Sequence, residues 1–231
     1  MIWDVDVQRH FVHAQRSFAL QVRFASPARR LVLFGPSGAG KSQTLKIIAG
    51  LTRPDTGHVR LAGDTLVDMA AGLDIPARAR RLAYVFQDYA LFPHLNVVQN
   101  IAFGLQHGWR NAGRDAQHEA VERWMRAFEL GPVAHQYPEQ LSGGQRQRTA
   151  LARALVAQPR ALLLDEPFAA LDPALRERLR DELADLQAAL DIPLVLITHD
   201  EADVRRFGSD VLQIADGRVR EAEAPHEALA A

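Results

Sequence analysis

Apolar and polar residues alternate along the first part of the chain, and this period of two predicts β-strands. Trp3, Val5 and Val7 are separated by polar residues, and the same alternation runs from Phe18 to Phe24. Successive side chains of a strand point to opposite faces, so a half-buried strand carries this pattern. The N-terminal segment is therefore expected to form antiparallel strands.

Continuous apolar runs of strand length follow later in the chain. The clearest runs lie at 31–34, 161–165 and 193–198, and a weaker strand pattern lies at 57–63. After the first run, Leu45, Ile48 and Ala49 share one face of an expected helix. After the second run, Asp172 and Pro173 form a helix start, with the aspartate as cap and the proline at the first helical position.

The middle of the chain, from about 88 to 155, shows helical spacing instead. One apolar group falls at i, i+3, i+4 and i+7, namely Val121, Trp124, Met125 and Phe128. Gly131 is the expected end of that helix, and the tract at 110–120 is expected to be a solvated loop and helix start. Near the C-terminus, Asp216 and Gly217 are typical of a hairpin turn. Together the patterns predict a mixed α/β core, an N-terminal antiparallel sheet and a helical subdomain.

The stretch GPSGAGKS, Gly35 to Ser42, lies between the first apolar run and its helix. It matches G-x-x-x-x-G-K-[ST], in which glycines let backbone amides wrap phosphates at the positive end of a helix. Lys41 places a charge on the β- and γ-phosphates, and Ser42 offers a hydroxyl to Mg²⁺. The expected nucleotide contacts are Gly35, Pro36, Ser37, Gly38, Ala39, Gly40, Lys41, Ser42 and Gln43.

Polar residues that can carry chemistry follow three of the expected strands. Asp165 and Glu166 end one of them, where Asp165 is placed to hold Mg²⁺ and Glu166 is the candidate general base for an attacking water. Gln87, in the stretch YVFQDY, follows a further short apolar strand, and His199 follows the run at 193–198. Ligands of open α/β sheets bind at the carboxyl ends of strands, so these residues are expected around a γ-phosphate.

The stretch LSGGQ, Leu141 to Gln145, starts a helix with two glycines, although glycine is about 1 kcal/mol worse than alanine in a helix. Ser142 and Gln145 have the S-x-x-Q spacing of a capping box. A capping box does not require Gly143 and Gly144, which expose backbone amides at the positive end of the helix. The stretch therefore predicts a second anion site.

Composition narrows the classes of function. The chain has 231 residues, 48% hydrophobic and 24% charged, with a formal net charge of -1 and no cysteine. This charge gives no argument for nucleic acid or an acidic membrane surface, and the lack of cysteine excludes disulfides and thiolate metal sites. The apolar runs are far shorter than the ~20 residues of a membrane span. The N-terminus carries no secretion pattern. A role at a membrane would therefore need another chain to hold the protein there.

The order of these motifs resembles the ATP-binding subunit of ABC transporters over nearly the whole chain. GPSGAGKS resembles the family's phosphate loop, LSGGQ its signature motif, ALLLDEP its second acidic motif and AALD, at 169–172, its D-loop. Gln87 resembles the Q-loop glutamine and His199 the switch histidine. The resemblance implies a phosphate-loop NTPase core with an N-terminal antiparallel β subdomain and an inserted α-helical subdomain.

The resemblance also implies how the chain is divided. A single nucleotide-binding domain would cover 1–231, with the ATP-binding core and β subdomain at 1–87 and 156–231 and the helical subdomain at about 88–155. No C-terminal regulatory domain is expected.

In this family two subunits pack head to tail, and the signature of one closes on the ATP held by the phosphate loop of the other. The resemblance implies that the signature residues Ser142, Gly143, Gly144 and Gln145 serve the partner's nucleotide. It also implies that Asp172 helps to organise the dimer contact. The second anion site would thus belong to the nucleotide of a neighbouring subunit.

Within one subunit, the resemblance implies that Ser42, Gln87 and Asp165 hold Mg²⁺ and that Gln87 and His199 assist Glu166 in catalysis. The family usually stacks an aromatic residue on adenine. Phe11 is the nearest candidate, with His10 and His13 beside it.

One cassette without a membrane span favours a transporter subunit with separate membrane partners. DNA-repair relatives need a long coiled-coil insertion, for which there is no room between Gln87 and Ser142, and ribosome-acting relatives usually carry two cassettes. The segment after Gln87 resembles importer ATPases, in which it receives a short helix of the membrane subunit. The docking candidates are Tyr89, Leu91, Phe92 and His94, of which Leu91 and Phe92 are equally expected as core.

We therefore expect a homodimeric ATPase that powers import from the cytoplasmic face of a bacterial-type inner membrane. Its partners would be integral membrane permease subunits and, indirectly, a substrate-binding protein. The stretches GLTRPDTGHVRLAGDTLVD and PHLNVVQNI are most similar to molybdate-type import ATPases.

Several alternatives follow from the same residues. Iron, sulfate or polyamine are alternative substrates, and a non-transport cytosolic ABC ATPase is the alternative class. A phosphate-loop kinase or GTPase would need an acceptor site or an N-K-x-D motif, and neither is recognisable.

Overall fold

The computed structural model describes residues 1–13, 16–105, 119–169 and 171–220. Most of the expected loop at 110–120, Ala170 of the AALD motif and the C-terminal residues 221–231 lie outside these ranges. The chain divides into two compact units. The N-terminal unit comprises Met1–Arg80 with Pro193–Ala231, and the middle unit comprises Arg81–Ile192. The subdomain boundaries near 87 and 155 stay predictions of the sequence.

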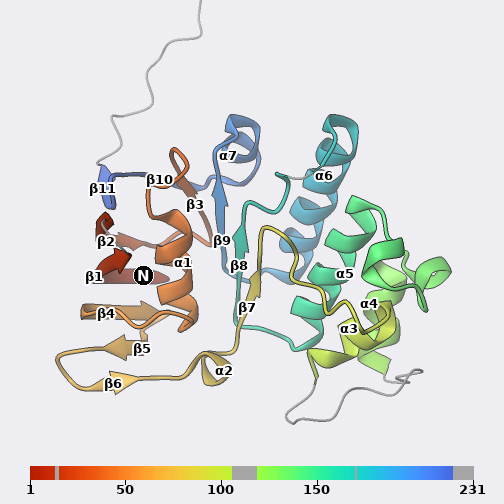
Figure 1. Ribbon diagram of the computed structural model, residues 1–231, viewed down its shortest axis with the longest axis horizontal. Coiled ribbons are helices and arrows are strands. Elements are labelled where there is room, and N and C mark those ends of the chain that lie inside the picture. The colour runs from red at the N-terminus through yellow and green to blue at the C-terminus, as the bar shows by residue number, and fades with distance from the viewer. Residues whose placement is uncertain (14–15, 106–118, 170, 221–231) are drawn as a thin grey trace, which may run out of the picture. The chain divides into compact units, whose positions relative to one another are not determined.

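The N-terminal unit is built on a β-sheet (Figure 1). Its strands are β1 (Trp3–His13), β2 (Arg16–Ser26), β3 (Arg30–Phe34), β4 (Thr56–Leu61), β5 (Asp64–Asp68), β6 (Leu73–Asp74), β9 (Leu194–Thr198), β10 (Asp210–Ala215) and β11 (Arg218–Arg220). Their order is β6-β5-β4-β1-β2-β11-β10-β3-β9. β1 pairs antiparallel with β2 and β4, whereas β3 lies parallel between β10 and β9. The expected antiparallel strands are confirmed, and Trp3, Val5 and Val7 are fully buried at 0% exposure.

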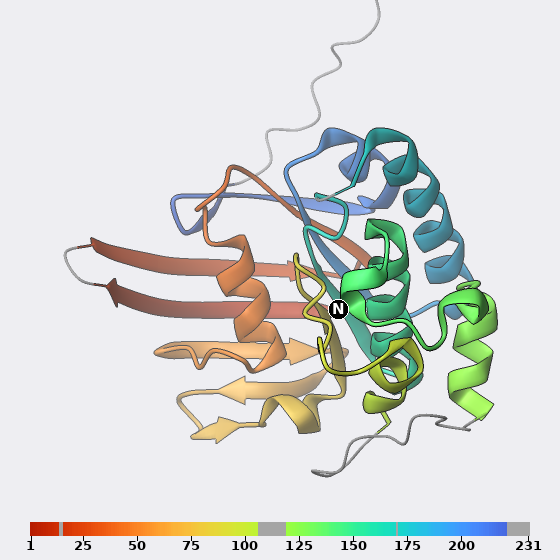
Figure 2. The ribbon, with the colours of Figure 1, turned by 45° about the vertical axis from the view of Figure 1, so that its right-hand side comes forward.

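Helix α1 (Lys41–Ala49) follows β3 and packs on this sheet. Figure 2 shows it running across the long strands β1 and β2. Leu45 and Ile48 on its inner face are fully buried, as the helical spacing predicts. The remaining helices of the unit are α2 (Ala77–Arg80) and α7 (Glu201–Phe207).

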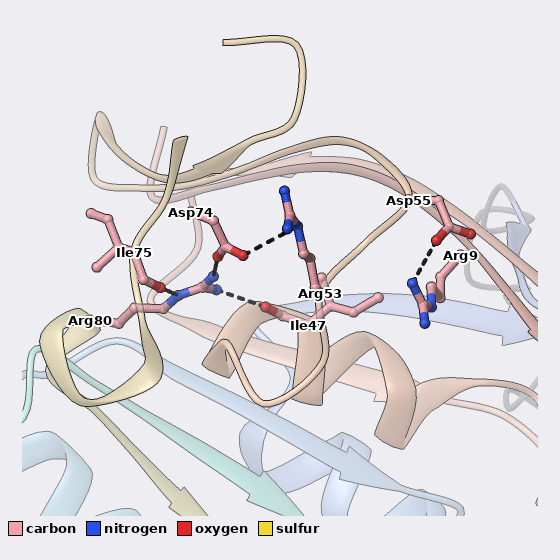
Figure 3. Close-up of polar contacts among 7 residues, drawn as sticks. All are labelled: Arg9, Ile47, Arg53, Asp55, Asp74, Ile75 and Arg80. Carbon is pink, nitrogen blue, oxygen red and sulfur yellow. Dashed lines mark hydrogen bonds and ion pairs between the residues drawn. The ribbon is translucent and has the colours of Figure 1, made fainter. Parts of the chain in front are cut away.

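Arg80 holds the C-terminal end of α1 in place (Figure 3). Its side chain is 0% exposed, and its guanidinium donates to the carbonyls of Ile47 and Ile48 over 2.8 Å each. It also donates to the Ile75 carbonyl and to Asp74. Burial lowers the pKa of Arg80, and the nearby Asp74 carboxylate partly offsets this effect. A guanidinium nevertheless stays charged in proteins. A cation at the last carbonyls of a helix complements its dipole, so Arg80 fixes the helix that follows the phosphate loop.

The expected hairpin at Asp216 and Gly217 is confirmed between β10 and β11, where Ala215 lies opposite Arg218. Asp216 has φ 51° and Gly217 has φ 75°, and hairpin turns of two residues need positive φ at both positions. A Cβ at Gly217 would lie 2.1 Å from the carbonyl oxygen of Ala19 in β2. Only glycine fits there.

The middle unit contains two parallel strands, which pair with each other, and several helices (Figure 1). The strands are β7 (Leu82–Val85) and β8 (Ala161–Asp165). The helices are α3 (Val97–Phe103), α4 (Glu119–Ala127), α5 (Gly143–Val156) and α6 (Pro173–Leu190), with short 3₁₀ turns at Gly131–Val133 and Pro138–Gln140. Every residue of β8 is buried, which explains its unbroken apolar run.

Two helix boundaries test the sequence predictions. Asp172 caps α6, because its carboxylate accepts the Leu175 backbone N–H over 3.0 Å, and Pro173 starts the helix as expected. The predicted end of α4 at Gly131 is wrong. The helix ends at Ala127, and Glu129 takes a left-handed conformation with φ 53° just beyond it. Gly131 instead begins the following 3₁₀ turn.

Candidate functional site

The phosphate loop forms in the N-terminal unit as a tight turn between β3 and α1. Gly40 is the N-cap of α1 with φ 102°, a conformation that favours glycine. A Cβ at this position would lie 2.7 Å from Leu20 and 3.0 Å from Phe18 in β2. The glycine therefore lets the helix start lie directly against the sheet, with its amides turned toward the loop.

Lys41 lies inside the loop. Its side chain donates to the carbonyl oxygens of Gly35 and Pro36 over 2.7 and 2.9 Å, and the residue is 4% exposed. A buried ammonium is costly unless polar partners surround it, so these contacts hold the loop around the charge. The cation thus lies where a phosphate group would be bound by the same loop.

His199 follows β9, the strand parallel to β3, and Thr198 lies opposite Phe34 in the register. His199 and Gly35 therefore leave neighbouring strands at the same edge of the sheet. The Thr198 hydroxyl accepts the Asp200 backbone N–H over 3.0 Å and donates to the Asp203 carboxylate. This fixes the turn that carries His199, whose side chain is exposed.

A cavity of about 790 Å³ adjoins the phosphate loop. It is lined by residues 36–39 of the loop, 17–19 of β2 and parts of the β10–β11 hairpin. Its size is within the ~300–1,000 Å³ typical of small-molecule sites. Phe18 lines the cavity, whereas Phe11, the aromatic residue chosen from the sequence, does not. The two rings are neighbours across β1 and β2, with centroids 6.2 Å apart.

In the middle unit, Asp165 ends β8 and is 6% exposed. Tyr84 of β7 donates its hydroxyl to Asp165 Oδ2 over 2.8 Å. Burial raises the pKa of Tyr84, and the Asp165 carboxylate raises it further, so the phenol stays a hydrogen-bond donor. The role of Tyr84 was not predicted from the sequence, although a tyrosine in a strand next to a buried one is a signal that its hydroxyl needs a partner.

Glu166 and Gln87 lie just beyond the ends of β8 and β7. Glu166 is half-buried and has φ 46°, a left-handed conformation that costs a non-glycine residue roughly 1–2 kcal/mol. Such strain is often kept at functional sites. Gln87 is exposed in a turn closed by the Tyr89 N–H and the Phe86 carbonyl, 2.8 Å apart. Both side chains lie after parallel strands, as expected from the sequence.

The capping box at the start of α5 is confirmed. Ser142 Oγ accepts the Gln145 N–H over 3.3 Å, and Gln145 Oε1 accepts the Ser142 N–H over 2.8 Å. The glycines between them also have a packing role that the sequence did not indicate. A Cβ at Gly144 would lie 3.1 Å from Leu175 at the start of α6, and Gly144 is buried. Glycine therefore lets α5 and α6 begin close together.

The docking candidates differ in exposure. Tyr89 is only 4% exposed, so its side chain does not contribute to a docking surface, and this part of the prediction is wrong. Its hydroxyl donates to the Pro167 carbonyl over 3.4 Å, a core contact. Leu91 and Phe92 are half-buried and His94 is exposed. The docking hypothesis therefore rests on these three residues.

Arg153 of α5 ties this segment to the helix that begins at the signature motif. Its guanidinium donates to the backbone carbonyls of Tyr89 and Ala90 over 2.7 and 2.8 Å, and it lies 5.3 Å from the centre of the Phe92 ring. Burial lowers the pKa of Arg153, but a guanidinium keeps its charge.

The donor chemistry of the residues expected to bind a metal suits Mg²⁺. Ser42 offers a hydroxyl, Gln87 an amide oxygen and Asp165 a carboxylate, and Mg²⁺ prefers such hard oxygen ligands while keeping several waters. Ser42 lies in the N-terminal unit and the other two in the middle unit.

Comparisons with known proteins agree with these motifs. Residues 22–169 match the family model described as ABC transporter. The chain is 40% identical to the molybdenum import ATP-binding protein ModC of Mesorhizobium japonicum, over 94% of this chain and 57% of that protein. It is 39% identical to the sulfate/thiosulfate import ATP-binding protein CysA of Vibrio cholerae, over 97% of this chain and 58% of that protein. The chain thus spans little more than half the length of these relatives.

A solved structure is similar over almost its full length. The ATP-binding cassette MJ0796, in a dimeric post-hydrolysis state bound to ADP and Pi, superposes with a TM-score of 0.78 at 30% identity. The match covers 95% of this chain and 97% of that one. The expected fold class, a phosphate-loop NTPase core with an antiparallel β subdomain and an α-helical subdomain, is thereby confirmed.

Proposed function

The chain belongs to the ABC transporter family, and from this premise we propose that it binds ATP with Mg²⁺ and hydrolyses the ATP to power solute import. The observation that carries the proposal is the phosphate loop, whose backbone surrounds the Lys41 ammonium at the start of α1. Helix-start amides and a buried cation together form a site for the phosphates of a nucleotide.

The base of the nucleotide would occupy the cavity beside the loop. Phe18 lines this cavity and offers a half-buried aromatic face, so it joins Phe11 as a candidate to stack on adenine. The two can be separated by Phe18→Leu and Phe11→Leu, since the residue that stacks on the base should weaken ATP binding more.

Ser42, Gln87 and Asp165 would hold the metal through oxygen atoms, and the bound ion would neutralise charge on the β- and γ-phosphates. Glu166 would accept a proton from the attacking water, while Gln87 and His199 would orient the water and the γ-phosphate. The left-handed backbone at Glu166 supports this role, because strained conformations of non-glycine residues cluster at functional sites.

Glu166→Gln tests the assignment. A glutamine keeps the size of the side chain but cannot accept the proton, so hydrolysis should fall by about 10²-fold or more while ATP binding is retained. Steady-state phosphate release and titration with a fluorescent ATP analogue measure the two properties. The exposed Glu139→Gln, in the same unit, is the control and should behave as the unchanged protein. Near-normal turnover of Glu166→Gln would refute the role of Glu166.

The proposal includes partners. We infer a head-to-tail homodimer in which Ser142, Gly143, Gly144 and Gln145 of one subunit meet the nucleotide of the other, with Asp172 at the contact. The similar solved cassette is described as dimeric. The described residues include no helix long and apolar enough to cross a membrane. Permease subunits would hold the chain at the cytoplasmic face of the inner membrane, through Leu91, Phe92 and His94.

The transported solute is proposed to be molybdate or a related oxyanion such as sulfate, delivered by a substrate-binding protein. The support is similarity alone, since the relatives are named for molybdenum and sulfate/thiosulfate import. Deleting the gene and measuring uptake of labelled molybdate, sulfate, iron and polyamine would identify the solute. Failure to co-purify a polytopic membrane protein would instead favour a non-transport ATPase.

A further inference from the structure

We propose that Tyr84 is a positioning residue for Asp165, and that its hydroxyl fixes the orientation in which this carboxylate meets the Mg²⁺ of the bound nucleotide. The inference rests on the proposed function and adds a residue to it. Its starting point is the hydrogen bond of 2.8 Å from the phenol to Asp165 Oδ2.

The backbone directs the two side chains to the same face. In the parallel pair of β7 and β8, Tyr84 lies opposite Leu163. Residues two apart on a strand point the same way, so Asp165 lies on the face of Leu163 and Tyr84. The contact therefore follows from the register of two strands and does not depend on a single flexible rotamer.

The ring of Tyr84 is held as well. Its centroid lies 4.4 Å from that of Phe86, the next residue on the same face, with the planes tilted by 44°. Tyrosine has few rotatable bonds, so a packed ring leaves the hydroxyl little freedom. The donor that reaches Asp165 is thus rigid.

A neutral donor suits a carboxylate that must bind a cation. Asp165 is 6% exposed, and a polar group at this depth needs hydrogen-bond partners. A lysine or arginine would compete with the metal for the carboxylate, whereas a phenol adds no charge and fixes the orientation of the carboxylate. Outer partners of this kind typically change metal affinity by about 10–100-fold when removed.

The alternative is that Tyr84 only fills the core, in which case phenylalanine would serve equally well. Tyr84→Phe removes the hydroxyl and keeps the ring. The experiment measures the dissociation constant of a fluorescent ATP analogue in excess Mg²⁺ and in EDTA. The ratio of the two constants reports the contribution of the metal to binding, and a general loss of folded protein would not change that ratio selectively.

We expect Tyr84→Phe to bind the analogue in EDTA with the same dissociation constant as the unchanged protein. In Mg²⁺ its dissociation constant should be about tenfold higher than that of the unchanged protein. Tyr89→Phe is the matched control, because it removes a buried hydroxyl that bonds the Pro167 carbonyl instead of a carboxylate. It should keep the full Mg²⁺ gain. An unchanged ratio in Tyr84→Phe, or equal losses in both buffers, would overturn the positioning role. If the unchanged protein shows no Mg²⁺ gain, the proposed metal site fails and the Tyr84 proposal fails with it.

Discussion

Lys41 stabilises the phosphate loop and is also the residue proposed to contact the phosphates. The residue is 4% exposed, and its contacts with the carbonyls of Gly35 and Pro36 hold the loop closed around its own charge. The same charge would attract phosphate oxygens, for which charge-assisted hydrogen bonds are about twice as strong as neutral ones. The structural role of the lysine and its proposed binding role therefore depend on the same charge.

Lys41→Ala should lose ATP binding. The substitution removes the charge and the internal contacts together, and one charge-assisted hydrogen bond alone is worth about 1.5–3 kcal/mol, or at least tenfold in affinity. Titration with a fluorescent ATP analogue measures the effect. Lys46→Ala, on the same helix but away from the loop, changes the net charge equally and should bind normally. Wild-type affinity of Lys41→Ala would show that the loop is not the nucleotide site.

At the residue scale, the phosphate loop between β3 and α1 could be predicted from the sequence, whereas the roles of two aromatic residues, Phe18 and Tyr84, could not. The loop was predictable because its spacing is specific. The roles of Phe18 and Tyr84 could not be predicted, because period-two alternation shows only on which face of a strand a side chain lies. It does not show whether that side chain contacts the core, a cavity or a carboxylate. Only strand register brings Tyr84 to Asp165, and register is a long-range property.

At the scale of the element, α5 combines a glycine-rich start with an unusual interior. Gly144 allows close packing on Leu175, so the glycine pair has a structural reason beside the proposed anion site. Gln147, one turn further on, is 0% exposed, and neither polar atom of its amide has a hydrogen-bond partner among the described residues. A buried amide without partners costs roughly 1–3 kcal/mol.

Gln147→Met should therefore stabilise the protein. Methionine has a similar volume and no amide to desolvate, so the free energy of unfolding in urea should rise by about 1 kcal/mol. Gln187→Met in α6 is the matched control, since this buried glutamine does donate, to the Ile192 carbonyl over 3.2 Å. The control should lose stability. A loss in Gln147→Met would mean that its amide has a partner in solution.

Element boundaries show where local signals suffice. The α6 start was predictable because Asp172 and Pro173 act within one turn. The end of α4 was not, because Glu129 accepts a left-handed backbone while Phe128 and Leu130 on either side are buried. Tertiary packing there outweighs the preference for glycine at that conformation.

At the scale of the whole molecule, the capping box and the proposed contact with a partner subunit make different demands on the same residue. Ser142 is exposed, and its hydroxyl and backbone N–H are both engaged with Gln145. This arrangement orders the first turn of α5 and keeps its amides at the surface. The sequence indicates both readings of LSGGQ, and the hydrogen bonds between Ser142 and Gln145 confirm the capping box.

Ser142→Arg separates the two readings. Either reading allows a loss of about 0.5–2 kcal/mol of stability for the missing cap. Only the dimer reading expects ATP-dependent dimerisation to disappear while each monomer still binds ATP, because the arginine would fill the space that the partner's nucleotide must enter. Glu166→Gln as a background should trap the closed dimer, and size-exclusion chromatography with and without ATP measures it. Ser142→Ala in the same background removes the cap hydroxyl and one proposed contact without adding bulk, so it should dimerise more weakly than the parent and clearly better than Ser142→Arg. If Ser142→Arg also dimerises with ATP, the LSGGQ stretch is a capped helix start and the proposed two-subunit site is wrong.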